Sequence, residues 1–128
     1  MSKAKPRQWS MEQMRKDGYL TGITEFFNSH TKRRKDLFGF IDFIAVGSGR
    51  CVGVQCCARS SIGSHRRKIL EECGEAAFEW LRSGNEIQIH GWDRIDEPLK
   101  TKEGHRVRRR LKVEPITINM LDISPDTC

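Results

Sequence analysis

Two polar side chains interrupt a strongly apolar stretch near the middle of the chain. Residues 36–58 read as two apolar strands joined by a glycine-rich turn. If Val46 pairs with Cys51 across that turn, Asp42 lies directly opposite Gln55 on one side of the sheet. A carboxylate and an amide are costly to bury in an apolar hairpin unless they bind something. A metal ion is the obvious partner for such a pair.

Other side chains with suitable chemistry lie close to this pair in the sequence. Cys57 points to the same side as Gln55 because strand side chains alternate. Asp36 lies six residues before Asp42 and shares its face on an unbroken strand, although it also suits a turn. Glu25 sits near the end of a preceding strand, where it is either a ligand or an exposed partner of nearby basic residues.

Basic residues gather in several short segments of the chain. One of them, residues 65–68, falls in the first turn of a predicted helix. Positive charge there is unfavourable because it opposes the helix dipole, and an approaching phosphate would make it favourable. Each segment alone also fits an ordinary solvated surface. The candidate nucleic-acid-binding residues are Lys32, Arg33, Arg34, Arg59, His65, Arg66, Arg67, Lys68, Arg108 and Arg110.

The composition limits the class of protein. A chain of 128 residues is long enough for one domain with a real core. A net charge of +6 and a pI near 9.3 favour polyanionic partners, nucleic acid before an acidic membrane surface. No apolar run approaches the ~20 residues that span a bilayer, and no apolar signal segment begins the chain, so we expect a cytoplasmic protein without a membrane partner.

Two kinds of cofactor are not supported by the sequence. Its five cysteines show no Cys-x-x-Cys spacing, which argues against zinc and against a disulfide framework. The chain also has no P-loop and no GxGxxG motif, so no nucleotide cofactor is expected.

Periodicity and turn residues predict the elements that position these side chains. We expect a flexible basic tail over residues 1–8, a single domain over 9–120 and a flexible tail over 121–128. The fold class is α/β (α+β), with a mixed central sheet flanked by helices in the order α-β-β-β-α-β-β. The predicted elements are helices at 10–17 and 64–83, strands at 19–27, 36–46, 51–58, 86–92 and 106–116, and a basic loop at 28–35.

This order resembles the PD-(D/E)XK nuclease superfamily, and within it the small Holliday-junction-resolvase-like and VRR-NUC-like domains common in phages. Phe40-Ile41-Asp42 stands where the family has Pro-Asp, and Val54-Gln55-Cys56-Cys57 stands where it has an apolar residue, Glu or Asp, any residue and Lys. The resemblance covers roughly residues 10–116. It implies a restriction-endonuclease-like core in which two carboxylates hold Mg²⁺ or Mn²⁺ and a lysine positions the attacking water.

The chain departs from that motif at two of its three positions. Asp42 matches the first carboxylate, whereas Gln55 replaces the second and Cys57 replaces the lysine. An amide oxygen can ligate a hard cation but brings no charge. Three explanations stay open: the site recruits substitutes, the fold binds nucleic acid without cleaving it, or Asp42 and Gln55 only bond each other and nearby backbone. The possible substitutes are Glu25, Asp36 or Glu12 for charge, and Arg59 or Lys68 for the lysine.

These observations predict a metal-dependent nuclease that hydrolyses DNA, including branched or junction DNA in phage replication or repair. Its catalytic residues would be Asp42, Gln55 and Cys57, and its metal ligands Asp42, Gln55, Glu25 and Asp36. The alternatives are a catalytically degenerate nucleic-acid-binding module on the same fold and a scaffold protein. Relatives that act on two-fold symmetric junctions are often dimers, so the resemblance suggests a homodimer. The expected location is the cytoplasm, which is that of the host if the protein is phage-encoded.

Overall fold

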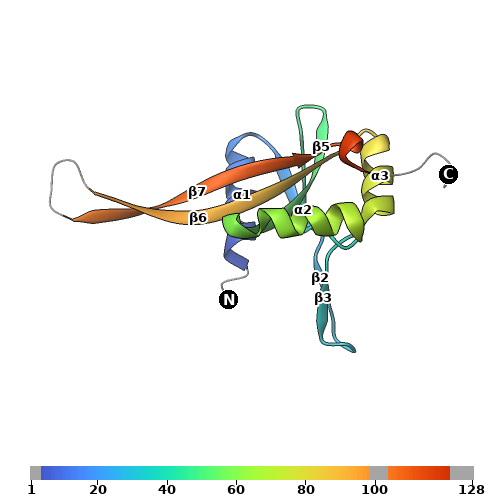
Figure 1. Cartoon of the computed structure of the whole chain (residues 1–128), viewed down its shortest axis with the longest axis horizontal. Helices are drawn as coiled ribbons and strands as arrows, with labels where there is room; N and C mark the ends of the chain where they lie inside the picture. Colours follow the sequence, from blue (N-terminus) through green and yellow to red (C-terminus); the bar gives the residue numbers. More distant parts are fainter. Residues whose placement is uncertain (1–3, 99–103, 122–128) are drawn as a thin grey trace.

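The structure, a computed structural model, describes residues 4–98 and 104–121. These residues form an α+β fold with a mixed five-stranded sheet and helices on both of its faces (Figure 1). The helices are α1 (Ala4–Lys16), α2 (Ile62–Glu71) and α3 (Gly74–Arg82), with short 3₁₀ turns η1 (Arg59–Ser61) and η2 (Ile118–Met120). The strands are β1 (Leu20–Ile23), β2 (Phe26–Asn28), β3 (Arg33–Lys35), β4 (Phe43–Gly47), β5 (Arg50–Ala58), β6 (Glu86–Pro98) and β7 (His105–Ile116).

The sheet has the strand order β1-β4-β5-β6-β7. Only β5 and β6 are parallel among these neighbours, and α2 and α3 form the crossover that parallel neighbours require. Strands β2 and β3 form a separate two-stranded sheet that projects from the body (Figure 1). No helix among the described residues is long and apolar enough to cross a membrane.

The register predicted for the β4–β5 hairpin is confirmed. Val46 pairs with Cys51, and the pairing continues to Phe43 opposite Val54. Ser48 and Gly49 form the two-residue turn, both with positive φ (52° and 75°), which matches the twist of the flanking strands.

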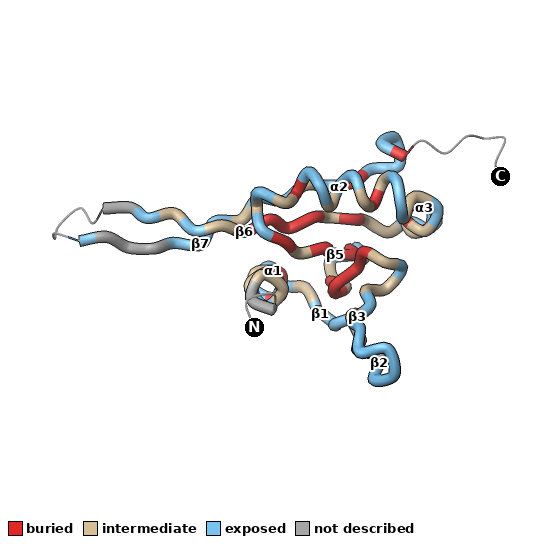
Figure 2. The backbone as a smooth tube through the Cα atoms, turned by 60° about the horizontal axis from the view of Figure 1, so that its bottom comes forward, coloured by how far each residue is buried: buried red, intermediate tan, exposed pale blue. Residues whose placement is uncertain are grey.

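Two apolar cores lie on opposite faces of the sheet. One contains Ile69 of α2 and Ala77 of α3 against Ile87 and Ile89 of β6. The other lies under α1 and includes Met11 and Met14, packed on Phe43, Ala45, Val52 and Val54. Figure 2 shows the buried positions concentrated in β5 and the inner part of β6, between α1 and α2.

The first helix begins earlier than the sequence predicted. It starts at Ala4 rather than at Ser10, so residues 4–8 of the predicted tail are helical. Pro6 fits because the N–H groups of a first helical turn have no partners in the helix. Ser10 is not a cap: it is fully buried and bonds Trp92 and His90 of β6.

Both segments on either side of the basic loop are shorter strands than predicted. The 19–27 strand is divided into β1 and β2, and the predicted loop contains β3. The 36–46 strand begins only at Phe43, because Phe38 and Gly39 have positive φ and the chain folds back through a Leu37–Ile41 bridge.

The later elements also differ in their ends. The predicted 64–83 helix is two helices that break at Glu72 and Cys73, just before Gly74, a poor helix former. Strand β6 continues past residue 92 to Pro98 because β7 pairs with it from Ile87 to Pro98. Of the tail predicted at 121–128, Leu121 is buried and the rest lies outside the described residues, as do residues 1–3.

Candidate metal centre

Three carboxylates converge where β4 begins. Oxygen atoms of Glu25, Asp36 and Asp42 all lie within 4.8 Å of one another. Glu25 and Asp36 are half-buried and Asp42 is buried. Three like charges at this spacing repel strongly in a partly buried site, so the cluster favours a bound proton or a cation.

Backbone hydrogen bonds position two of these residues, Asp42 and Glu25. The Asp42 N–H donates to the Val54 carbonyl at 2.8 Å, and its side-chain Oδ2 accepts the Cys56 N–H at 2.8 Å. Thr24 donates its N–H to the Asp42 carbonyl at 3.1 Å, which places Glu25 beside the start of β4.

Asp36 reaches the cluster by another route. The predicted 36–46 strand begins only at Phe43 and so does not include Asp36. The fold-back between Leu37 and Ile41 returns the chain towards Asp42 instead. The predicted proximity of Asp36 to Asp42 therefore holds, although its predicted cause was wrong.

Gln55 completes the arrangement from β5. Its Nε2 donates weakly to Asp42 Oδ2 at 3.3 Å, and the residue is only 4 % exposed. Among the described residues, its Oε1 is buried and has no hydrogen-bond partner. Leaving a buried amide oxygen unpaired costs about 1–3 kcal/mol. Since amide and carboxylate oxygens are the ligands of hard divalent cations, the donor set fits Mg²⁺ or Mn²⁺.

Burial and charge act together on Asp42. The pKa of its carboxyl is raised to about 8, and burial is the largest cause. A hydrogen bond with Asp36 and charge repulsion from Asp36 and Glu25 also raise this pKa. The Cys56 N–H acts in the opposite direction because it favours the carboxylate. A proton therefore remains on the cluster at neutral pH unless a cation replaces it.

Two side chains that can carry positive charge, Arg7 and His65, lie near the carboxylates. Arg7 of α1 donates to Glu25 Oε1 at 2.6 Å. His65 of α2 is half-buried, and its Nδ1 has no hydrogen-bond partner in the described part of the chain. Burial and the charge of Lys68 lower the pKa of His65, while Asp36 raises it. His65, predicted as a phosphate contact, thus lies within the electrostatic reach of the acidic cluster.

Cys57 lies on the face predicted for it but carries no charge. It is buried, and burial together with the nearby Asp42 raises its thiol pKa to about 11. At neutral pH it is a neutral thiol that can neither replace a lysine nor act as a thiolate. Glu12, the third predicted source of negative charge, is exposed on α1 and is not part of the cluster.

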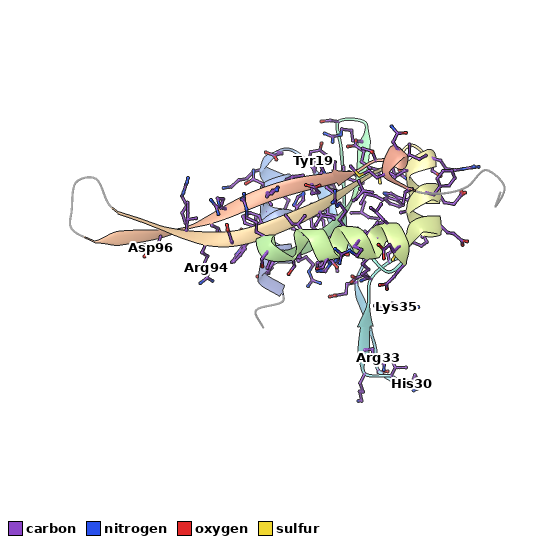
Figure 3. All side chains as sticks on the ribbon, in the orientation of Figure 1. Tyr19, His30, Arg33, Lys35, Arg94 and Asp96 are labelled. Carbon is purple, nitrogen blue, oxygen red and sulfur yellow. The ribbon has the colours of Figure 1, made fainter. Side chains whose placement is uncertain are left out.

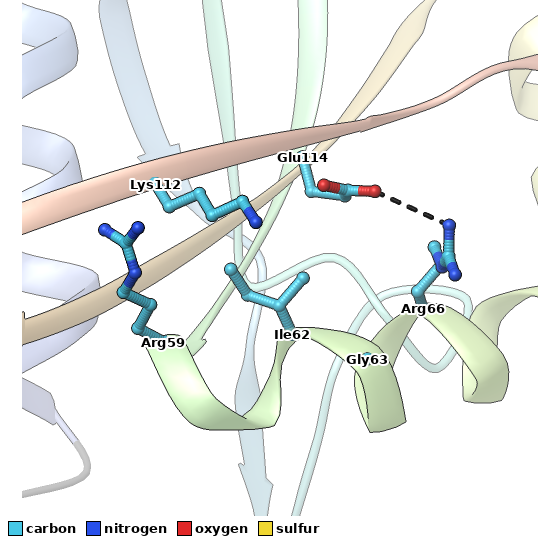
Figure 4. Close-up of a pocket in the computed structure, with 6 residues that line it drawn as sticks. All are labelled: Arg59, Ile62, Gly63, Arg66, Lys112 and Glu114. Atoms are coloured by element: carbon cyan, nitrogen blue, oxygen red, sulfur yellow. Dashed lines mark ion pairs between the residues drawn. The ribbon is translucent and has the colours of Figure 1, made fainter.

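A basic pocket lies between α2 and β7 (Figure 4). It has a volume of about 300 Å³ and is lined by Arg59, Arg66 and Lys112 together with Ile62, Gly63 and Glu114. Arg66 pairs with Glu114 at 3.5 Å. This pocket brings together two predicted nucleic-acid-binding residues and one basic residue of β7.

The remaining predicted basic residues are spread over the surface. Arg67 is exposed on α2, and Lys32 and Arg33 are exposed on the β2–β3 projection, where Figure 3 labels Arg33. The side chain of Arg34 lies outside the described residues. Arg108 and Arg110 are exposed on β7, and Arg110 makes a two-point pair with Asp93 at 3.0 and 2.7 Å.

Sequence reasoning missed Arg7 and a cluster around Trp9. Arg94 and Arg109 lie against the Trp9 ring, with guanidinium carbons 5.9 and 4.8 Å from its centroid. Trp9 also makes an edge contact with Trp92, at 5.5 Å between ring centroids. These contacts join residues far apart in the chain, so no local sequence pattern predicts them.

Comparisons with protein-family models, curated proteins and solved structures found no match to this chain.

Proposed function

We propose that this protein is a divalent-metal-dependent nuclease that hydrolyses DNA phosphodiester bonds at the Glu25/Asp36/Asp42 cluster. The observation that carries the proposal is the meeting of three carboxylates with the unpaired amide oxygen of Gln55. A structural pair of Asp42 and Gln55 alone would need neither the other two acids nor an orphaned oxygen.

The resemblance to PD-(D/E)XK nucleases belongs to this proposal. With the small β2–β3 sheet set aside, α1 is followed by three sheet strands, a helical crossover, and then β6 and β7. This order supports a restriction-endonuclease-like core. The departures from the motif are then substitutions within one site, in which Glu25 and Asp36 supply the charge that Gln55 lacks.

The residues around the cluster have distinct parts in this chemistry. A bound divalent ion supplies Lewis-acid polarisation of a phosphoryl oxygen and a lower pKa for an attacking water. Glu25, Asp36, Asp42 and Gln55 would hold that ion. Arg7 restrains Glu25 through their 2.6 Å ion pair. The charges of Lys68 and Asp36 both act on the pKa of His65, which supports a position of Lys68 near the cluster. Lys68 is therefore the best substitute for the missing lysine.

Cleavage assays test this function directly. Branched, duplex and single-stranded DNA are incubated with Mg²⁺ or Mn²⁺, using the wild type and the near-isosteric variant Asp42→Asn. We expect cleavage that needs the ion and that falls by at least about 100-fold in the variant. Glu79→Gln, at an exposed position of α3, is the matched control, since it removes one carboxylate outside the cluster.

Two results would contradict the nuclease proposal. One is cleavage that survives Asp42→Asn or Asp42→Ala, because the ligand held by the Cys56 N–H would then be dispensable. The other is the absence of cleavage on all three DNA forms with either ion.

The second candidate is a nucleic-acid-binding module that has lost cleavage. It is favoured by the neutral Cys57 thiol, which leaves the expected lysine position without charge. This version predicts salt-sensitive DNA binding that is unaffected by EDTA and by Asp42→Asn, with no cleavage under any condition.

A further inference from the structure

The β6–β7 hairpin extends well beyond the rest of the sheet (Figure 1). Strand β5 pairs with β6 only as far as Ala58 opposite Trp92, whereas β6 and β7 pair onwards from Asp93–Arg110 to Pro98–His105. These six outer pairs, which we call the arm, extend about 20 Å. An isolated two-stranded ribbon is marginally stable in water, so its length calls for an explanation beyond packing.

Arginines occupy both faces of the arm. Paired residues of an antiparallel ribbon share a face, so Arg110 lies on one face with Asp93, and Arg109 lies on the opposite face with Arg94. Arg108 is on the same face as Arg110 because the two are two residues apart. From residue 93 to residue 112 the sequence has eight Lys and Arg residues against four Asp and Glu residues.

One face of the arm continues into the basic pocket beside α2. Lys112 pairs with Gly91, and a Cβ on Gly91 would lie 2.3 Å from Ile62 of α2, so this face of the sheet is the α2 face. Arg108, Arg110 and Lys112 therefore lead along β7 towards Arg59 and Arg66.

The root of the arm, where residues 92–94 and 109–111 leave the sheet, is held against α1. Trp9 contacts Arg94, Arg109 and Trp92. The adjacent Ser10 Oγ accepts the Trp92 Nε1–H at 2.7 Å. The same helix carries Arg7, which bonds Glu25 of the acidic cluster. The arm and the proposed metal site are thus anchored to one rigid element.

We propose that the arm enters the major groove of B-form DNA. A ribbon that lies on the outside of a duplex needs positive charge on one face, whereas a ribbon inside a groove meets phosphates on both sides. The B-DNA major groove, about 12 Å wide, admits a two-stranded β-ribbon, and the deep, narrow major groove of A-form RNA does not. Single strands are bound mainly by stacking on aromatic rings, and no Phe, Tyr or Trp occurs between residues 93 and 110.

This inference rests on the proposed function for its choice of nucleic acid, since it names duplex DNA as the substrate of the same site. Its test is binding without metal, which separates it from cleavage. Fluorescence anisotropy of a labelled 20-base-pair duplex in EDTA is measured for the wild type, Arg108→Ala/Arg110→Ala and Arg94→Ala/Arg109→Ala. The matched control is Arg15→Ala/Arg82→Ala, which removes the same charge outside the arm.

We expect each arm variant to bind roughly tenfold to thirtyfold more weakly near 0.15 M salt, with the salt slope reduced by about 2. The control keeps most of its affinity. Because Arg94 and Arg109 also pack on Trp9, Arg94→Lys/Arg109→Lys is included, and it should recover binding by restoring the charge. A loss from only one of the two faces would overturn groove insertion.

The groove itself is tested with modified duplexes. Glucosylated 5-hydroxymethylcytosine fills the major groove and should abolish binding, whereas netropsin in the minor groove should leave it unchanged. Equal affinity for an RNA duplex or for single-stranded DNA of the same sequence overturns the proposal. If the arm variants lose binding but Asp42→Asn binds normally, the proposal for the arm is supported even if the protein does not cleave DNA. If the arm variants bind and cleave like the wild type, only the nuclease proposal survives.

Discussion

The β4–β5 and β6–β7 hairpins place polar side chains in opposite environments. At the start of β4–β5, a few polar groups are buried and converge on Asp42. Along the outer β6–β7 arm, described charged side chains are half-buried or exposed and lie on both faces. Burial removes the water that screens charge, so changing a single polar group of the first hairpin has a large effect on the free energy of folding or of ion binding. In the arm, consequences arise only from many weak contacts acting together.

The largest effect that tests this contrast is metal-dependent stability. At free Mn²⁺ one hundred times above its dissociation constant, the wild type should gain about 2.7 kcal/mol in the free energy of unfolding. Asp42→Asn should abolish the gain, and Glu79→Gln should keep it. Thermal unfolding with Mn²⁺ and with EDTA measures this difference. An equal gain in Asp42→Asn would mean that the ion binds elsewhere.

The next effect concerns pH and His90, which is buried between Ser10 and Gln88. Burial lowers the pKa of His90 to about 4. The unfolded chain takes up this proton near pH 6.5, so the stabilisation from neutral His90 is complete above that pH and is lost as the pH falls towards 4. Between pH 7 and pH 4.5, the loss should be on the order of 2 kcal/mol.

Asp42 changes the stability with pH in the opposite direction to His90, so the experiment must separate the two contributions. Its raised pKa makes the metal-free protein less stable as the pH rises from about 4 to about 8. We therefore compare Asp42→Asn with Asp42→Asn/His90→Gln in denaturant titrations at pH 7 and pH 4.5. A pH dependence that is the same in both variants would exclude His90 as its source.

A smaller effect is expected where the arm meets the body. Ser10→Ala leaves the buried Trp92 Nε1–H and His90 Nδ1 without their shared partner. The free energy of unfolding should fall by about 1–2 kcal/mol. Ser10→Thr, which keeps the hydroxyl, serves as the comparison in urea unfolding. No change in Ser10→Ala would show that the root of the arm is less rigid than its contacts indicate.

The smallest effect is expected in the arm itself. Arg110→Ala breaks the exposed two-point pair with Asp93, yet the melting temperature should stay unchanged because solvent screens that pair. Differential scanning calorimetry measures this. A clear fall in melting temperature would show that the arm, like the acidic cluster, depends on individual charges.

Local signals predicted the elements that obey local rules. The register of β4–β5, and with it the meeting of Asp42 and Gln55, followed from a glycine-rich turn and the alternation of strand side chains. The 106–116 strand followed from the same alternation. The arm was missed because residues 93–98 are mostly polar, and only their pairing with β7 makes them a strand.

The amino-acid sequence by itself determined the α+β class, the apolar hairpin with its opposed acid and amide, and the basic character of the chain. The sequence offered Glu25 and Asp36 as ligands with other roles left open, and only the tertiary structure decided that they join Asp42. It also decided that His65 lies near Asp36, and that Arg7 and Trp9 connect α1 to both regions. The physical reason is range. Periodicity and turn chemistry act over a few residues, whereas these contacts depend on how strands pair and where the chain folds back.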